Sequence, residues 1–199
     1  MPNRLVLLRL LAIAVAAFTA AVGAVAFWPK SERASQGTGE ALIGGPFALT
    51  DAEGRRRTDA EFRGRHMLVF FGFTNCPDFC PTALHTISQA MEKLGPAADK
   101  VVPIMITVDP ERDTPAQLKN YAQNFDRRVV MLTGTGAEIA AAARAYRVYY
   151  QKRPLETAGE YTMDHSAFIY LMGPDGRFIT HFRHAVPPDD LAAALKKRL

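Results

Sequence analysis

The sequence contains little cysteine and little excess charge. Its 199 residues include only two cysteines, Cys76 and Cys80, so any thiol chemistry must use this pair. The net charge is +4, but residues 1–34 hold four Lys or Arg side chains and one Glu, which leaves 20 basic and 19 acidic residues in the remainder. A remainder so close to neutral lacks the basic surface of a nucleic-acid-binding domain. Internal repeats and low-complexity blocks are also lacking, and the length suits one domain with a short appendage.

One long uncharged run lies near the N-terminus. Residues 10–28 form nineteen positions without a charge, and as a helix they would span roughly 28 Å, close to the thickness of a hydrocarbon core. Arg4 and Arg9 precede the run, which places the N-terminus in the cytoplasm by the positive-inside rule. We therefore predict an uncleaved, single-pass transmembrane helix at residues 1–30, in a bacterial inner membrane, with the rest of the chain in the periplasm.

Two further parts follow this anchor. Residues 31–45 are polar, small and rich in glycine, which predicts a flexible tether. From residue 46 onward, strand and helix signals alternate, which predicts one domain at residues 46–199. The expected elements are a hairpin turning at residues 53–54, strands at 67–73, 101–108 and 129–132, helices at 80–94, 114–125 and 135–146, a hairpin with strands at 166–172 and 177–182, and a closing helix at 188–199.

This order of elements predicts an α/β fold. It implies a mixed sheet flanked by helices, with an N-terminal β-hairpin extension. A dithiol that follows the first buried strand and opens a helix is typical of a thioredoxin-like fold. The right-handed crossover makes the strands at 67–73 and 101–108 parallel, so Cys76 and Asp109 are expected at one edge of the sheet.

Cys76 and Cys80 are separated by three residues, in the pattern C-x-x-x-C. On a helix, this spacing puts both sulfurs on one face with Cα atoms about 6 Å apart. The pair can then form a disulfide or point two thiolates at one metal ion, and a helix N-terminus favours the thiolate form in both cases. A purely stabilising disulfide is the plainer alternative, but it would close a very short loop and constrain the unfolded chain little.

Two thiolates need a third ligand to make a good metal site, and the chain has five histidines. His66 lies at the opposite end of the strand from Cys76, roughly 20–25 Å away at about 3.3 Å per residue, and His85 faces away around the helix. His165 is expected at the start of the strand at 166–172, beside the end of the strand at 67–73. His184 is the reserve candidate, and His181 is a weaker one. Two thiolates with one imidazole suit Cu(I) first, and also Cu(II) or Zn.

Other thiol chemistries use different patterns. A thioredoxin-type oxidoreductase usually has C-x-x-C and a cis-proline before its last hairpin, whereas residues 156–172 contain no proline. A cysteine peroxidase needs T-x-x-C, and Thr74 is only two residues before Cys76. A periplasmic thiol–disulfide oxidoreductase with Cys76 and Cys80 as its redox pair nevertheless stays open as the alternative to a metallochaperone.

Four ordered motifs resemble the Sco/SenC family of copper-binding cytochrome c oxidase assembly factors. They are FFGFTNCPDFCP at 70–81, ITVDPERDTP at 106–115, AYRVYY at 145–150 and YTMDHSAFIYLMGPDG at 161–176. The resemblance covers about residues 40–199, and it implies a membrane-anchored thioredoxin-like domain. The family's copper ligands carry over onto Cys76, Cys80 and His165. Asn75 stands where many members have His, but that position is not one of the three ligands.

The resemblance also implies partners. Such proteins help to build the binuclear copper A centre of cytochrome c oxidase subunit II, and some members act instead as reductants of that centre's cysteines. Another periplasmic copper chaperone or a thiol reductant is then a second expected partner. A disulfide between Cys76 and Cys80 cannot bind copper as two thiolates, so the two roles exclude each other at any instant.

Three acidic residues, Asp109, Asp113 and Asp164, are expected near the site. Asp113 is explained as the residue that opens a helix with Thr114. Capping does not explain Asp109, which we predict to tune the site or to dock a partner. Asp164 directly precedes His165, where a sequence neighbour cannot easily hydrogen-bond the same ring, so its role is open.

Overall fold

The computed structural model describes residues 42–199. The predicted transmembrane helix at residues 1–30 lies outside the described residues, as does most of the predicted tether. No helix in this described part is both long enough and apolar enough to cross a membrane.

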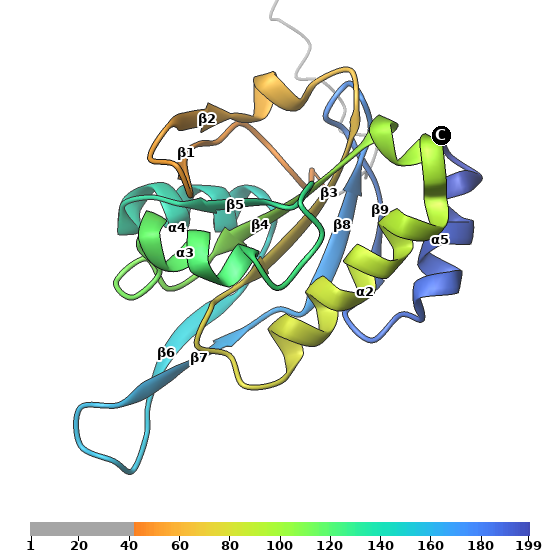
Figure 1. The fold of residues 1–199 in the computed structure, drawn as a ribbon. Helices are drawn as coiled ribbons and strands as arrows, with labels where there is room; N and C mark the ends of the chain where they lie inside the picture. The colour runs from red at the N-terminus through yellow and green to blue at the C-terminus, as the bar shows by residue number, and fades with distance from the viewer. Residues whose placement is uncertain (1–41) are drawn as a thin grey trace, which may run out of the picture. The chain divides into compact units, whose positions relative to one another are not determined.

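Seven strands form one mixed sheet (Figure 1). They are β1 (Ala48–Asp51), β2 (Arg56–Thr58), β3 (His66–Gly72), β4 (Val101–Thr107), β5 (Val130–Thr133), β8 (Phe168–Met172) and β9 (Phe178–Arg183). The strand order is β2-β1-β5-β4-β3-β8-β9. The pairs β3–β4 and β4–β5 are parallel and the other pairs are antiparallel. The predicted mixed sheet, its parallel crossover and its two terminal hairpins are therefore confirmed.

Helices cover the central strands. They are α2 (Phe79–Leu94), α3 (Pro115–Ala122), α4 (Gly136–Ala145) and α5 (Pro188–Lys196), and Figure 1 shows α2 and α5 side by side. Every residue of β3 and β4 is buried, as expected for strands whose two faces are both packed. Thr135 and Glu138 form a capping box at the start of α4, and Thr114 caps α3 by accepting a hydrogen bond from the backbone of Gln117.

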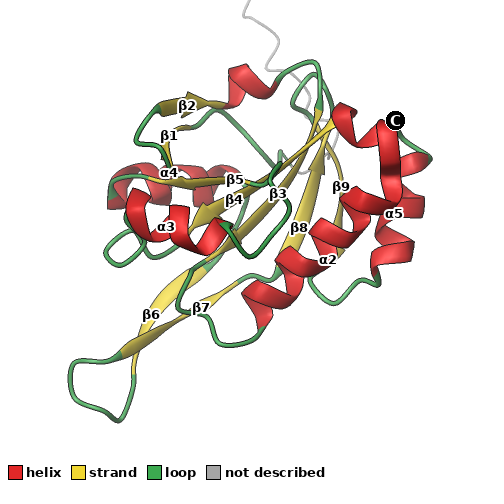
Figure 2. Ribbon diagram, viewed as in Figure 1, coloured by secondary structure: helices red, strands yellow, loops and turns green. Residues whose placement is uncertain are grey.

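A two-stranded arm was not predicted. Strands β6 (Tyr150–Pro154) and β7 (Tyr161–His165) pair antiparallel and project from the body at the lower left of Figure 2. The predicted placement of His165 at the start of the strand at 166–172 is wrong, because His165 ends β7. β6 is largely exposed, and β7 buries only Met163 among partly exposed residues, so neither strand carries a strong apolar pattern that would reveal it in the sequence.

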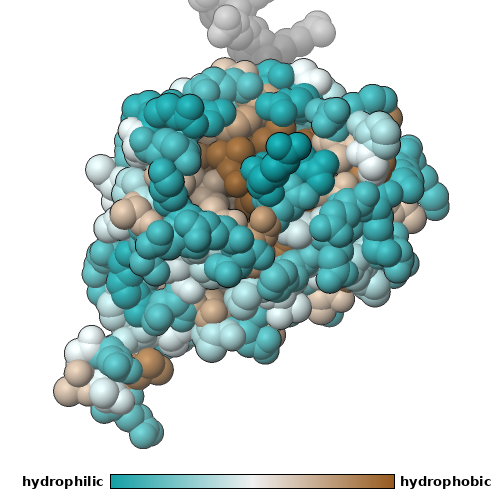
Figure 3. Space-filling model, in the orientation of Figure 1, coloured by the Kyte–Doolittle hydropathy of each residue, from teal (hydrophilic) through white to brown (hydrophobic). Residues whose placement is uncertain are grey.

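The surface of the arm and of the body is mostly polar. The face drawn in Figure 3 is largely hydrophilic, with an apolar area in the upper part of the body and a small apolar spot on the arm. Leu155, which follows β6, is 48% exposed. Two short 3₁₀ helices, η1 (Asp59–Phe62) and η2 (Gly95–Lys100), were also not predicted. Neither approaches the end of β3, where the cysteines lie.

Candidate metal centre

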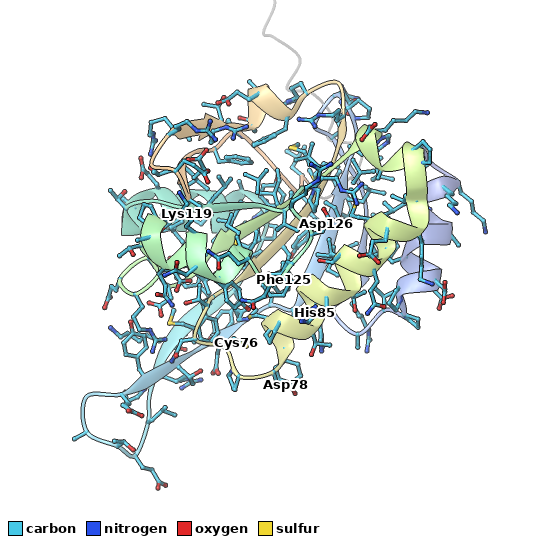
Figure 4. The ribbon with its side chains drawn as sticks, in the orientation of Figure 1. Cys76, Asp78, His85, Lys119, Phe125 and Asp126 are labelled. Carbon is cyan, nitrogen blue, oxygen red and sulfur yellow. The ribbon has the colours of Figure 1, made fainter. Side chains whose placement is uncertain are left out.

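The two cysteines lie where β3 leads into α2. Cys76, which is labelled in Figure 4, is in the connecting loop. Cys80 is the second residue of the helix. The expectation that both cysteines share one helix face was therefore wrong for Cys76. Pro77 explains the difference, because a proline disfavours helical backbone angles in the residue before it.

The two sulfurs differ in burial. Cys80 is 0% exposed, whereas Cys76 is 9% exposed. The backbone N–H of Cys80 donates a hydrogen bond to Sγ of Cys76 over 3.4 Å, so the loop cysteine partly caps the helix that carries the other. Both cysteines are free thiols, which leaves both sulfurs available for a ligand.

His165 is the imidazole that the fold brings to this pair. Its Nε2 lies 3.5 Å from Sγ of Cys80, and its Nδ1 lies 3.1 Å from the carbonyl oxygen of Ser166. A carbonyl oxygen only accepts hydrogen bonds, so we assign the ring hydrogen to Nδ1. The lone pair of Nε2 then faces the sulfur, which is the orientation a metal ligand requires.

The pKa values of the two cysteines are shifted in opposite directions. A hydrogen bond from the Cys80 side chain, opposed by burial, lowers the pKa of Cys76 to about 4. The same contact with Cys76, together with burial and the negative charge on Cys76, raises the pKa of Cys80. At neutral pH the pair therefore holds one thiolate, on the more accessible sulfur, and one buried thiol.

Aromatic rings and a glycine shape the space around these groups. The edges of Phe70 and Phe73 pack against the His165 ring, with centroid separations of 6.1 and 5.8 Å. Gly72 leaves room for the buried thiol, since a Cβ at this position would lie 3.0 Å from Sγ of Cys80 and 2.6 Å from a ring carbon of Phe70.

Asp113 fixes the loop that carries Cys76, a role that the sequence reasoning missed. Its carboxylate is fully buried and accepts hydrogen bonds from the backbone N–H of Thr74 (3.0 Å), the hydroxyl of Thr74 (2.6 Å) and the hydroxyl of Thr107 (2.6 Å). Burial raises the pKa of Asp113. The sequence suggested only a helix-opening role for Asp113, because Thr74 lies 39 residues earlier in the chain.

Asp109 is 3% exposed and therefore cannot dock a partner directly. Its carboxylate pairs with Arg112 and accepts a hydrogen bond from the hydroxyl of Tyr161 over 2.9 Å. The Arg112 guanidinium in turn stacks over the Tyr161 ring at 3.7 Å. These contacts join the loop after β4 to the arm strand that ends at His165.

The other histidines and Asp164 that the sequence offered as site residues lie away from the two sulfurs or face other groups. His66 begins β3 at its far end, and the exposed ring of His85 packs against Phe125, so neither reaches the sulfurs. The ring of His181 packs on Phe168, with a centroid separation of 4.9 Å. Asp164 forms an exposed ion pair with Arg153 instead of supporting the His165 ring.

A pocket of about 410 Å³ lies beside the dithiol. Cys76, His165 and the reserve candidate His184 all line it. As the side chains are placed, residues 42–199 hold no cluster of three His, Cys, Asp or Glu groups close enough to bind a metal ion. The donor types fit copper, but binding requires the side chains to draw closer together.

A thioredoxin-like sheet that carries a free dithiol and a facing imidazole defines a class of thiol- and metal-active domains. Within that class, a family model described as SCO1/SenC matches residues 35–199. The chain therefore belongs to the SCO1/SenC family, which confirms the resemblance of its four motifs.

Relatives of known sequence support this assignment. The human mitochondrial SCO1 homolog is 40% identical over 159 residues, covering 79% of this chain and 53% of that protein. Protein sco1 of Schizosaccharomyces pombe is 41% identical over 160 residues, covering 79% of this chain and 61% of that protein. The chain thus spans about half to two thirds of the length of such relatives.

Solved structures are similar as well. ScoI of Bradyrhizobium japonicum, determined with copper bound, is 52% identical and has a TM-score of 0.74, covering 79% of this chain and 99% of that one. BsSco, a member of the Sco family of cytochrome c oxidase assembly proteins with a disulfide switch, is 28% identical and has a TM-score of 0.63, covering 78% of this chain and 93% of that one.

Proposed function

We propose that this chain is a copper chaperone for cytochrome c oxidase assembly that binds copper through Cys76, Cys80 and His165. The observation that carries the proposal is the Nε2 lone pair of His165, which faces Sγ of Cys80 at 3.5 Å. Two sulfurs and one imidazole nitrogen suit Cu(I). The copper-bound structure of the Bradyrhizobium relative supports the choice of metal.

The protein groups prepare the site in different ways. Cys76 is already a thiolate at neutral pH, whereas Cys80 must give up its proton before it can bind a metal. The hydrogen bond from Nδ1 to Ser166 holds the His165 ring in one tautomer. Copper is the cargo in this scheme, and it leaves by exchange of these ligands for those of a recipient.

The family and the N-terminal sequence support a proposal for the recipient and the location. We infer that the recipient is the copper A centre of oxidase subunit II, and that another periplasmic chaperone supplies the copper. The uncharged run at residues 10–28, preceded by Arg4 and Arg9, supports a single inner-membrane anchor with a periplasmic domain. The domain would then work next to a membrane-bound oxidase.

The asymmetry of the thiols favours a second candidate function, thiol–disulfide reduction. The Cys76 thiolate can attack a partner disulfide and form a mixed disulfide, releasing one partner thiolate. Cys80, after losing its proton, then attacks Cys76, which releases the second partner thiolate and leaves a Cys76–Cys80 disulfide. The partner gains two electrons, and a separate thiol reductant must restore the pair.

Copper titration of the reduced full chain, kept in mild detergent, tests the proposal. Competition with a Cu(I) chelator should show one tightly bound ion per chain, lost in Cys76→Ser and Cys80→Ser and strongly weakened in His165→Ala. His85→Ala is the matched control, because that ring lies on the same helix as Cys80 but packs against Phe125. Reduction of a partner disulfide without copper binding would favour the second function.

A further inference from the structure

The loop at residues 109–113, which follows β4, contacts both halves of the proposed copper site. On one side, Asp113 holds the loop that carries Cys76 by accepting hydrogen bonds from Thr74. On the other side, the same loop contacts the arm, whose strand β7 ends at His165. This one loop therefore touches the elements that carry the accessible thiol and the imidazole.

Tyr161, the first residue of β7, is the arm residue that this loop holds. Its hydroxyl donates a hydrogen bond to the carboxylate of Asp109 over 2.9 Å, and its carbonyl oxygen accepts one from Nη1 of Arg112, also over 2.9 Å. The guanidinium carbon of Arg112 lies 3.7 Å from the centre of the Tyr161 ring, and Nζ of Lys152 lies 3.9 Å from it. Two hydrogen bonds and two cations at one aromatic residue make a firm attachment of the arm to the body.

The face of β7 that carries Tyr161 also carries His165. Alternate residues of a strand share a face, so Met163 belongs to this face as well. Met163 is buried, and the His165 ring packs against Phe70 and Phe73, so the shared face lies against the body. Strand β6 pairs with all five residues of β7. A displacement at one end of β7 is therefore passed to the other end.

The His165 ring has no other polar contact that would fix it relative to the sulfur. Its Nδ1 donates to the carbonyl oxygen of Ser166, the next residue of the chain, and this bond moves with the arm. The aromatic wall behind the ring also depends on the same attachment. Phe73, which packs against the imidazole at 5.8 Å, lies under the Arg112 guanidinium at 5.9 Å. The distance from His165 to Cys80 therefore depends on where the arm lies.

We propose that Arg112 and Tyr161 are positioning residues for copper binding, which hold the arm on the loop at residues 109–113 and thereby hold His165 against the dithiol. The inference rests on the proposed function, because it states what keeps the third ligand in place. Neither side chain is among the proposed ligands, and each acts through His165. Loss of their contacts speeds the release of Cu(I) and leaves the two sulfur ligands in place.

The rate at which the loaded full chain releases Cu(I) to a chelator tests this proposal. Arg112→Ala should release the ion roughly tenfold faster or more, because residues that orient a metal ligand commonly contribute that much to affinity. Tyr161→Phe, which removes only the hydroxyl, should give a smaller increase. In a His165→Ala background neither change should speed release further, because both act through that imidazole. A further loss in that background would indicate a merely structural role and would overturn the proposal.

A measurement without metal separates this proposal from the proposed function. In the reduced, copper-free chain, the Phe70 and Phe73 rings should displace the nuclear magnetic resonance signal of the His165 ring. Arg112→Ala should move that signal toward the position of a free imidazole. An unchanged signal would show that the pairing of β8 with the sheet is enough to hold the ring, and would overturn the proposal. Failure of the unmutated chain to bind Cu(I) would instead overturn the proposed function, because the resonance shift is read without copper.

Arg153→Ala is the matched control on the same arm. Arg153 pairs with Asp164 on the opposite face of the arm strands, so its loss should change neither the release rate nor the His165 signal. An effect as large as that of Arg112→Ala would contradict the specific role of Arg112. Circular dichroism checks that the variants fold, and Tyr161→Phe, the smallest change, carries the test if Arg112→Ala does not fold.

Discussion

The carboxylate of Asp113 accepts two hydrogen bonds from Thr74, a residue 39 positions earlier in the chain. Thr74 lies two residues before Cys76, so this contact fixes the start of the cysteine loop. Asp113 also accepts a hydrogen bond from Thr107 at the end of β4. One buried carboxylate thus attaches the metal-binding loop to the neighbouring strand.

We expect Asp113→Ala to weaken both the fold and copper binding. The change leaves the backbone N–H of Thr74 without its acceptor, and the loss of stability should be roughly 2–4 kcal/mol. Denaturant unfolding and Cu(I) competition measure the two effects. Asp126→Ala is the matched control, because Asp126 pairs with Arg128 between α3 and β5, away from the cysteines. It should lower stability but leave copper affinity unchanged; equal copper affinities in both variants would contradict the role given to Asp113.

Gly72→Ala should displace the buried thiol. The added Cβ would lie 2.6 Å from a ring carbon of Phe70 and 3.0 Å from Sγ of Cys80, so one of these groups must shift. Overpacking of this kind typically costs about 1–3 kcal/mol. Gly136→Ala is the control, since a Cβ there meets open space. Wild-type Cu(I) affinity and stability in Gly72→Ala would show that the site is looser than the structure indicates.

The reduced, metal-free protein should be alkylated at Cys76 with an unusual pH profile. Because the pKa of Cys76 is lowered to about 4, its thiolate persists as the pH falls from alkaline to mildly acidic values and is lost only near pH 4. An ordinary thiol loses its reactivity as the pH falls below its pKa of about 8.5. Mass spectrometry after iodoacetamide pulses should find modification at Cys76 and little at buried Cys80. In Cys80→Ala, which removes the hydrogen bond from Cys80 to Cys76, the pH profile of alkylation should move to higher pH. An ordinary thiol profile for Cys76 in the unmutated chain would contradict the lowered pKa of Cys76.

The full chain should remain in the membrane fraction after an alkaline carbonate wash. This expectation rests on the uncharged run at residues 10–28, whose length as a helix matches a hydrocarbon core. Deletion of residues 1–30 should release the domain. A periplasmic reporter fused to the C-terminus should be active, and activity only of a cytoplasmic reporter would contradict the predicted orientation.

Much of the fold could be predicted because buried strands leave a strong hydrophobic signal. The runs at 67–73 and 101–108 predicted β3 and β4, and the handedness of the crossover predicted their parallel pairing. The antiparallel pairing of β8 with β3 then brought His165 near the cysteines. These inferences needed only the order of the elements and the apolar pattern.

The remaining features depend on contacts that leave no local pattern. Strand β6 of the arm is largely exposed and β7 buries only Met163, so their hydrophobicity gives little sign that they are strands. The bonds between Asp113 and Thr74 join distant parts of the chain. The loop position of Cys76 depends on the restriction that Pro77 places on its backbone, which outweighed the helical reading of the cysteine spacing.

X-ray absorption spectroscopy of the Cu(I)-loaded full chain tests the central claim most directly. The claim is that Cys76, Cys80 and His165 hold copper together. The spectrum should show two sulfur atoms and one imidazole nitrogen around the ion, and the nitrogen contribution should disappear in His165→Ala. A shell with a single sulfur, or an unchanged imidazole signal in His165→Ala, would contradict the three-ligand site.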